Sequence, residues 1–248
     1  IKQFIEAVKA TTELYLPFEI EFITIESLFE STEPTPLHTV SVPLSPTHHL
    51  DIEVIKLSHR VESYGFKITQ TVQTIKLDTE KLKADGIEPT AAWGRLQAGE
   101  DVTLSNGSQL KSMDYTQRVA QVINIIVAGD NDSPQLLNEA AKGADLLVHE
   151  ATYTQAVADK IMSREDAFDP MHTTAKRIAS FAQSAKLNNL ILTHFSARYQ
   201  PYDDPESTTP NMADIRLEAE QYYQGNLWLA RDFMHFEVSH KAVRQLPN

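Results

Sequence analysis

The stretch LILTHFSARY, residues 190–199, joins an apolar run directly to a group of polar side chains. Its first three residues, with a β-branched isoleucine at their centre, are typical of a buried strand. The strand leads without a turn residue into His194, Ser196 and Arg198. This junction predicts that a buried strand places side chains that can bind a ligand or take part in catalysis at its carboxyl end.

Two stretches upstream repeat this junction. VINIIVAGD, residues 122–130, ends in Asp130, and DLLVHEATY, residues 145–153, contains His149 and Glu150. Amphipathic helices are predicted over residues 134–143, opened by Ser133, over 175–187, capped by Thr173 or Thr174, and over 212–225. Strands alternating with helices predict an α/β fold with a largely parallel sheet. Ligands of such sheets gather beyond the carboxyl ends of the strands, where these polar residues fall.

The remaining segments are less regular. The spacing of apolar residues predicts an amphipathic helix over residues 1–14 and a strand over 18–30. A loop rich in Pro, Thr and His is predicted over residues 31–50. Alternating polar and apolar residues over 50–68 predict paired strands, and LWLARDFMHFEV, residues 227–238, predicts a last strand.

Residues 70–101 form a section with few large apolar side chains and no clear core periodicity. Two interpretations are open: an arm that protrudes from the domain, which we favour, and a surface loop with a short helix.

Composition limits the class of protein. Of the 248 residues, 42% are hydrophobic and 23% are charged, as is ordinary for a globular protein. No apolar run approaches the roughly 18–20 residues that span a bilayer, and the first residues lack the pattern of a secretory signal, so the cytoplasm is expected. The absence of cysteine excludes disulfides and thiolate-bound zinc within this sequence. A net charge of −12 argues against a nucleic-acid coat protein, but not against an enzyme that meets nucleic acid through a local patch.

Four residues suit a metal centre when they are taken together: His59, Asp130, His172 and His194. Singly, each has an ordinary structural explanation, such as a hydrogen-bonded histidine or a carboxylate that caps a turn. Imidazole and carboxylate together suit zinc or manganese, and an open metal site generates hydroxide near neutral pH.

The motifs HEATY (149–153), HTTAKRIASFA (172–182) and LILTHFSARYQ (190–200) resemble the ribonuclease Z branch of the metallo-β-lactamase superfamily. These are zinc-dependent endonucleases that trim the 3′ end of precursor tRNA. The resemblance covers nearly the whole chain. It implies a single αββα sandwich domain over residues 1–248, with residues 70–101 inserted as an arm that grips the tRNA. It also implies a homodimer in which one subunit's arm serves the partner's site.

The resemblance also implies roles for individual residues. His59, Asp130 and His194 match metal ligands of the family, with Asp130 bridging two zinc ions, or manganese in their place. His172 matches a histidine that protonates the leaving oxygen, and Glu150 orients it or is coupled to its charge. Ser196 and Arg198 match positions beside the site that contact phosphate.

Three departures from the family pattern stand out. The His-x-His-x-Asp-His motif, which supplies further metal ligands, is absent, and the resemblance places it upstream of Ile1. We therefore expect a domain incomplete at its amino terminus, inactive by itself. The usual Gly-Asp-Thr is Gly-Asp-Asn here, through Asn131, and Thr90-Ala91-Ala92 replaces a Gly/Pro-rich turn of the arm.

Two other functions stay open at this stage. The acidic charge and the altered arm turn are compatible with another hydrolase of the superfamily, a phosphodiesterase or lactonase that acts on small molecules. The missing motif is compatible with a non-catalytic, RNA-binding half without a complete metal site.

Overall fold

The computed structural model describes residues 2–12, 22, 24–25, 39–165, 167–240 and 242–247. The chain divides into two compact units, Ile1–Val40 and Ser41–Asn248. In the first unit, helix α1 (Lys2–Thr12) confirms the predicted amphipathic helix over its described part. The strand predicted over residues 18–30 lies, apart from three residues, outside the described part of the chain.

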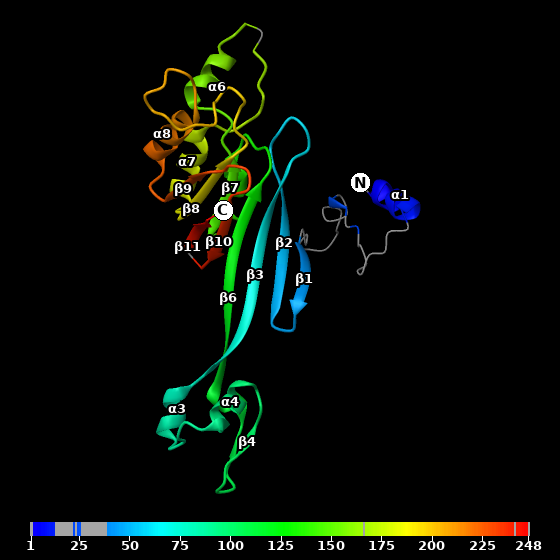
Figure 1. The fold of residues 1–248 in the computed structure, drawn as a ribbon, viewed down its shortest axis with the longest axis vertical. Helices are drawn as coiled ribbons and strands as arrows, with labels where there is room; N and C mark the ends of the chain where they lie inside the picture. The colour runs from blue at the N-terminus through cyan, green and yellow to red at the C-terminus, as the bar shows by residue number, and fades with distance from the viewer. Residues whose placement is uncertain are drawn as a thin grey trace. The chain divides into compact units, whose positions relative to one another are not determined.

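A seven-stranded mixed sheet is the framework, in the order β1-β2-β3-β6-β7-β8-β9. Its strands are β1 (Thr39–Ser45), β2 (His48–Lys56), β3 (Tyr64–Leu77), β6 (Thr116–Ala128), β7 (Leu146–Glu150), β8 (Asn189–Thr193) and β9 (Asn226–Leu229). Strands β2, β3 and β6 pair in antiparallel fashion, and β6 to β9 are parallel neighbours. The predicted α/β architecture around a central sheet is confirmed (Figure 1).

The paired strands predicted over residues 50–68 are confirmed as β2 and β3, in register from His48 with Val72 to Lys56 with Tyr64. The loop predicted over residues 31–50 is wrong for its second part, which forms β1 and the start of β2. Pro43 in β1 cannot donate to a ladder, and the strand lies at the edge of the sheet, where that loss is tolerated.

Helices α7 (Ala175–Ser184) and α8 (Met212–Tyr222) confirm two predicted helices. Thr174 caps the first by accepting from Arg177 N–H, and Asn211 caps the second in a reciprocal box with Asp214. Together with β7 and β8 they bury one apolar core, which includes Leu147, Ile178, Leu190, Leu192 and Ile215, all fully buried. The strands that carry the candidate chemistry are therefore packed against these two helices in one core.

Two predicted elements are shorter than expected. The helix predicted over residues 134–143 is a 3₁₀ helix, η1 (Pro134–Leu137), followed by turns, because the Ser133 hydroxyl donates to Asp132 and makes no cap. The strand predicted over residues 227–238 is interrupted between β9 and β10 (His235–Ser239), where Phe233 adopts a left-handed φ of 66°. Strand β10 pairs instead with β11 (Ala242–Leu246) as a two-stranded ribbon.

Residues 78–115 form a small helical unit at the far end of the long β3–β6 ribbon (Figure 1). It contains α3 (Thr79–Ala84), α4 (Ala91–Gln97), the short strands β4 (Val102–Thr103) and β5 (Gln109–Leu110), and α5 (Ser112–Tyr115). Its apolar side chains form a separate cluster around Leu82, Ile87, Leu96, Val102 and Leu110. This core was not predicted from the sequence, because its residues are spread over short elements.

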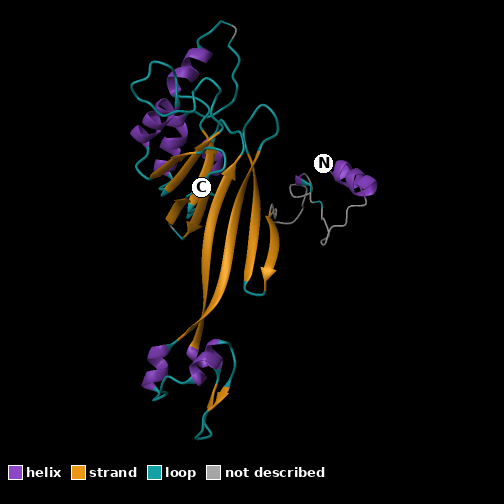
Figure 2. Cartoon of the chain, viewed as in Figure 1, coloured by secondary structure: helices purple, strands orange, loops and turns teal. Residues whose placement is uncertain are grey.

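The helical unit of residues 78–115 does not coincide with residues 70–101, the segment for which an arm was predicted. Residues 70–77 belong to β3. The helical unit ends at Tyr115, and the two strands that carry it meet beside it in the pair of Leu77 with Thr116. Elsewhere in the second unit, α6 (Gln155–Met162) stands with α7, α8 and their loops at the end of the sheet opposite to the helical unit (Figure 2). None of the helices in the described part of the chain has the length and apolar character that a bilayer crossing requires.

Candidate metal and acid–base site

Five of the predicted site residues meet at one edge of the sheet. Asp130 follows β6, Glu150 ends β7 and His194 follows β8, so three parallel strands deliver them side by side. His59 lies in the loop between β2 and β3, at the same edge because Gly65 of β3 pairs with Ala128 of β6. His172 completes the group from the loop before α7.

Asp130 lies between two histidines, with one carboxylate oxygen turned toward each. Its Oδ2 is 3.6 Å from His59 Nε2, and its Oδ1 is 3.5 Å from His194 Nε2. Both distances are too long for good hydrogen bonds. Two ligands of one tetrahedral zinc, each about 2.0–2.1 Å from the ion, lie roughly 3.4 Å apart. The chemistry and spacing of these side chains therefore fit a bound metal cation.

The ring of His59 is oriented from behind. Its Nδ1 is 2.9 Å from the carbonyl oxygen of Met171, so the hydrogen on Nδ1 is donated there and Nε2 keeps its lone pair for the site. Met171 adopts a left-handed φ of 54°, an unfavourable conformation for a residue with a side chain. The hydrogen bond to the Met171 carbonyl and the 5% exposure of the His59 side chain hold this ring in place.

Glu150 and His172 form a close pair. His172 Nδ1 lies 2.9 Å from Glu150 Oε2, and the Glu150 side chain is only 1% exposed. Burial raises the pKa of Glu150 to about 7, while hydrogen bonds from Thr152 and from Asn131 N–H act in the opposite direction. Burial also lowers the pKa of His172. The pair can therefore hold and release a proton near neutral pH.

The three imidazole rings stand in a row. The ring centroid of His172 lies 4.9 Å from that of His59 and 5.1 Å from that of His194. Ligand atoms of His59, Asp130 and His172 lie within 4.8 Å of one another, as do those of Glu150, His172 and His194. Because His172 Nδ1 faces Glu150, its Nε2 is the nitrogen available to the space between the other two histidines.

Asn131 has a place in the site that the sequence did not predict. It is fully buried, and its side-chain oxygen accepts from the backbone N–H groups of Ser58 and Ser133, both at 3.2 Å. Its amide nitrogen lies 3.1 Å from His149 Nε2, and its backbone N–H donates to Glu150 Oε1 at 2.6 Å. The residue that marks a departure from Gly-Asp-Thr thus ties the His59 loop to the ends of β6 and β7.

His149 lies beside Glu150 in sequence but faces away from the site. It is fully buried, and burial lowers its pKa to about 4. Its Nδ1 is 2.8 Å from the carbonyl oxygen of Glu150, so Nδ1–H donates and Nε2 accepts from Asn131. The strand-end histidine is therefore a neutral, structural residue.

Ser196 and Arg198 lie beyond the histidine row. Ser196 N–H donates to the carbonyl oxygen of Thr152 at 3.1 Å, which fixes the turn after His194. Arg198 is exposed, and its backbone N–H approaches Ser196 Oγ at 3.4 Å. Within the described part of the chain, no hydrogen bond or ion pair joins either side chain to Asp130 or Glu150, and contact of these residues with phosphate stays a prediction.

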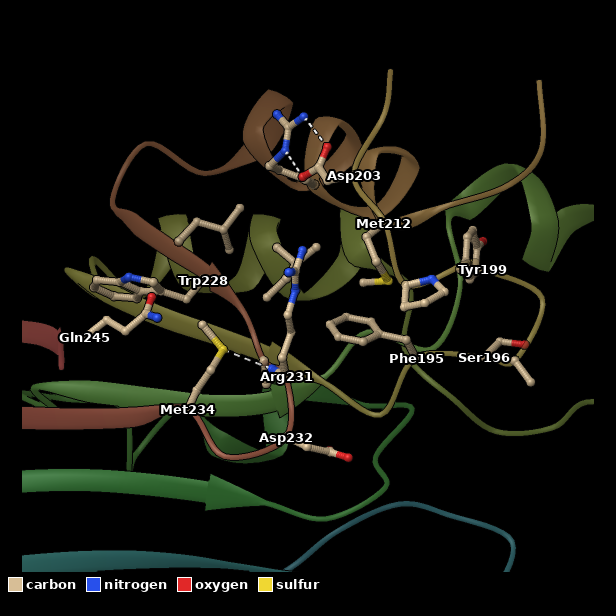
Figure 3. Close-up of a pocket in the computed structure, with 16 residues that line it drawn as sticks. Phe195, Ser196, Tyr199, Asp203, Met212, Trp228, Arg231, Asp232, Met234 and Gln245 are labelled. Carbon is tan, nitrogen blue, oxygen red and sulfur yellow. Dashed lines mark hydrogen bonds and ion pairs between the residues drawn. The ribbon is translucent and has the colours of Figure 1, made fainter. Parts of the chain in front are cut away.

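A hollow of about 920 Å³ opens next to Ser196 (Figure 3). Phe195, Trp228 and Met234 line it, and the guanidinium of Arg231 projects into it. None of the five clustered residues lines this hollow. A smaller hollow of about 130 Å³ borders His172.

Comparison with known proteins gives the following similarities. No family model matches the chain. It is 40% identical to ribonuclease Z of Marinobacter nauticus over 233 residues, which cover 94% of the chain and 66%, just under two thirds, of that protein. It is 32% identical to ribonuclease Z of Brevibacillus brevis over 223 residues, 78% of the chain and 67% of that protein. A crystal structure of human tRNase Z, short form, matches with a TM-score of 0.42 and 18% identity, over 94% of this chain and 62% of that one.

Proposed function

Because this chain belongs to the ribonuclease Z family, we propose that it serves a zinc-dependent endoribonuclease that removes the 3′ trailer from precursor tRNA. The observation that carries the proposal is the placement of Asp130, which presents one carboxylate oxygen to His59 and the other to His194. A carboxylate that faces a histidine with each oxygen could serve both ions of a two-metal hydrolase, which clamp the attacking and leaving oxygens of the phosphodiester.

His59, Asp130 and His194 would hold two zinc ions, with manganese as the other candidate. Bound zinc supplies a Lewis acid and a water that is deprotonated near neutral pH. Zinc takes four ligands, and the described residues offer fewer than that on each side of Asp130. We therefore propose that further ligands come from outside the described residues, and that the 248 residues alone are inactive.

Glu150 and His172 would supply the acid. Glu150 accepts from His172 Nδ1, which leaves Nε2 as the nitrogen that delivers a proton. A hydrogen on Nε2, aimed into the space between His59 and His194, would protonate the departing 3′ oxygen of the tRNA. The hydrogen bonds from Asn131 and Thr152 to Glu150 support this role, because they hold the carboxylate in one orientation.

Substrate contacts are proposed at two places. Ser196 and Arg198 would bind phosphate beside the metal site. The predicted arm of residues 70–101 overlaps the helical unit of residues 78–115, and in this proposal it would hold the tRNA away from that site. The separate apolar core of the helical unit supports a role as a stiff element. As part of the same proposal, the enzyme is a cytoplasmic homodimer in which one subunit's arm serves its partner.

Another hydrolase activity on small molecules, as a phosphodiesterase or lactonase, is the second candidate. The net charge of −12 favours it, because a strongly acidic protein gains nothing from the general electrostatic attraction that brings RNA to basic proteins.

One experiment separates the two functions. The complete protein is assayed with a 3′-extended precursor tRNA and with bis(p-nitrophenyl) phosphate, and its zinc content is measured. A second variant joins Leu77 to Thr116, which already pair, through a two-residue turn that replaces residues 78–115. We expect this variant to lose cleavage of the precursor and to keep cleavage of the small ester. Equal loss of both activities with the fold intact would contradict the proposed arm, and cleavage of the ester alone by the unaltered protein would favour the second candidate.

A further inference from the structure

Thr152, whose hydroxyl holds the Glu150 carboxylate, also reaches the other half of the candidate site at His194. It lies two residues after Glu150 and is 4% exposed. Its hydroxyl contacts Oε2 of Glu150, and it lies 3.0 Å from His194 Nδ1 and 2.9 Å from the carbonyl oxygen of His194.

The number of protons fixes the direction of these bonds. A hydroxyl has one hydrogen to donate, and it accepts through its lone pairs. While Glu150 is ionised, its carboxylate and the His194 carbonyl can only accept, so one of them takes the hydroxyl hydrogen. His194 Nδ1 must then carry a hydrogen and donate it to Thr152. In the neutral imidazole this leaves Nε2 with a lone pair, and Nε2 is the nitrogen that faces Asp130.

The same hydroxyl connects His194 to the acid pair. Glu150 Oε2, which accepts from Thr152, also accepts from His172 Nδ1. The direct distance from His194 Nδ1 to Glu150 Oε2 is 3.8 Å, beyond hydrogen-bond range. The Thr152 hydroxyl therefore connects His194 and Glu150, which are too far apart to form a hydrogen bond with each other.

The backbone around Thr152 strengthens this link. His194 adopts a left-handed φ of 56°, which needs support from its surroundings. Ser196 N–H donates to the Thr152 carbonyl at 3.1 Å, and Ala151 N–H donates to the Thr193 carbonyl at 2.9 Å. The turn that carries His194 is thus attached to the end of β7 on both sides of the ring.

We propose that Thr152 is a positioning residue whose hydroxyl fixes the Nδ1–H tautomer and the ring orientation of His194 and links this ligand to the Glu150–His172 pair. The assignment of His194 as a ligand rests on the proposed function. The tautomer itself does not, because it follows from the hydrogen bonds of the metal-free chain. Partners of this kind behind a metal-binding histidine typically change metal affinity by about 10–100-fold.

The test compares Thr152→Val with Thr152→Ser in the complete protein. Valine keeps the shape and removes the hydroxyl, and serine keeps the hydroxyl. Thr173→Val is the matched control, because Thr173 is equally buried and donates to the Asn131 carbonyl at 2.6 Å without touching His194. If Thr152→Val does not fold, Thr152→Ala takes its place.

Two measurements are made on each variant. Nitrogen-15 NMR of labelled histidines in the metal-free protein should report the Nδ1–H tautomer of His194 in wild type, Thr152→Ser and Thr173→Val, and a mixture of tautomers in Thr152→Val. Zinc titration should give a dissociation constant raised about 10–100-fold by Thr152→Val and close to wild type in the other two.

The results separate the two hypotheses. An unchanged tautomer and an unchanged zinc dissociation constant in Thr152→Val would overturn the role of Thr152. Wild-type protein that binds no zinc and cleaves no precursor would overturn the proposed function, whereas the tautomer measurement would still decide whether Thr152 orients His194.

Discussion

The backbone N–H of Asn131 donates a 2.6 Å hydrogen bond to Oε1 of Glu150. This bond joins the residue after the shared carboxylate, Asp130, to the carboxylate that holds His172. The proposed metal-binding and proton-carrying parts of the site are therefore connected by a backbone hydrogen bond, at the ends of two neighbouring parallel strands. A change at either strand end is expected to disturb both parts.

His194→Ala and His172→Ala should have different effects. His194→Ala removes a proposed ligand, so zinc content and activity of the complete protein should fall together. His172→Ala should leave zinc bound and lower turnover by about 10²–10⁴-fold, because it removes a proton donor. The loss should appear mainly in kcat, since the proton matters in the transition state.

Zinc content by elemental analysis and single-substrate kinetics check this difference. His172 is also close enough to His59 and Asp130 to ligate a metal. Loss of zinc in His172→Ala as complete as in His194→Ala would assign His172 to the metal rather than to the proton.

Asn131→Ala should be strongly destabilising. It leaves the N–H groups of Ser58 and Ser133 and the Nε2 of His149 without their buried partner. A buried polar group left unsatisfied costs about 1–3 kcal/mol, so a loss of roughly 2–5 kcal/mol in the free energy of unfolding is expected. Urea denaturation measures it.

Asn131→Thr, the residue that the family pattern carries there, is the informative companion. The single hydroxyl oxygen of threonine cannot occupy the separate positions of the amide oxygen, which faces Ser58 and Ser133, and of the amide nitrogen, which faces His149, so we expect a smaller but clear loss. Stability equal to wild type in both variants would show that the buried amide contributes little.

His149 should make the free energy of unfolding depend on pH. Its pKa is about 4 in the folded protein, and its ordinary value is 6.5. Between these values the unfolded chain binds a proton that the folded protein excludes. The stability is therefore fully present above pH 6.5 and is lost as pH falls toward 4, by about 3 kcal/mol in total.

Glu150 acts in the opposite direction, because its raised pKa lowers stability as pH rises from 4.5 to about 7. The comparison of wild type with His149→Gln removes this contribution, since both proteins keep Glu150. Denaturation curves at pH 4.5, 5.5 and 7 should show the wild-type advantage shrinking on acidification. A constant difference across this range would mean that His149 does not resist protonation.

The candidate site was largely predictable because its signals are local. Asp130, Glu150 and His194 each come directly at or after an apolar strand, and parallel strands bring their carboxyl ends together. The role of Asn131 was not predictable. Its partner Ser58 lies 73 positions away, so only the folded chain shows that the amide fits there. Thr152 lies within the motif HEATY, but the direction of its hydrogen bonds can be worked out only when the positions of Glu150 and His194 are known.

Two elements were predicted wrongly from the sequence, and each error has a physical cause. Over residues 134–143 the helical pattern was real, but Ser133 bonds to Asp132 instead of capping, and the segment tightens into a 3₁₀ turn. Over residues 227–238 the apolar run hides a left-handed residue, Phe233, which no periodicity reveals. Propensity and pattern describe the average conformation of such stretches, whereas a single side-chain bond or turn decides the actual one.

The separate core of residues 78–115 leads to the last prediction. Leu96 is fully buried in that cluster, and Leu192 is fully buried in the main core. Leucine to alanine at either position should cost about 2–5 kcal/mol, but in different parts of the molecule. Leu96→Ala should lower the hydrogen-exchange protection of residues 78–115 and spare the amides of β7 and β8, because the two clusters share no buried residue.

Leu192→Ala is the matched control and should lower protection across the main sheet. In the complete protein, Leu96→Ala should weaken cleavage of precursor tRNA much more than that of bis(p-nitrophenyl) phosphate. Leu192→Ala should weaken both, since it loosens the strand that carries His194. If Leu96→Ala reduced protection in β7 and β8 as much as Leu192→Ala, the two clusters would be one cooperative unit. A substitution in residues 78–115 would then also disturb the strands that carry the candidate site.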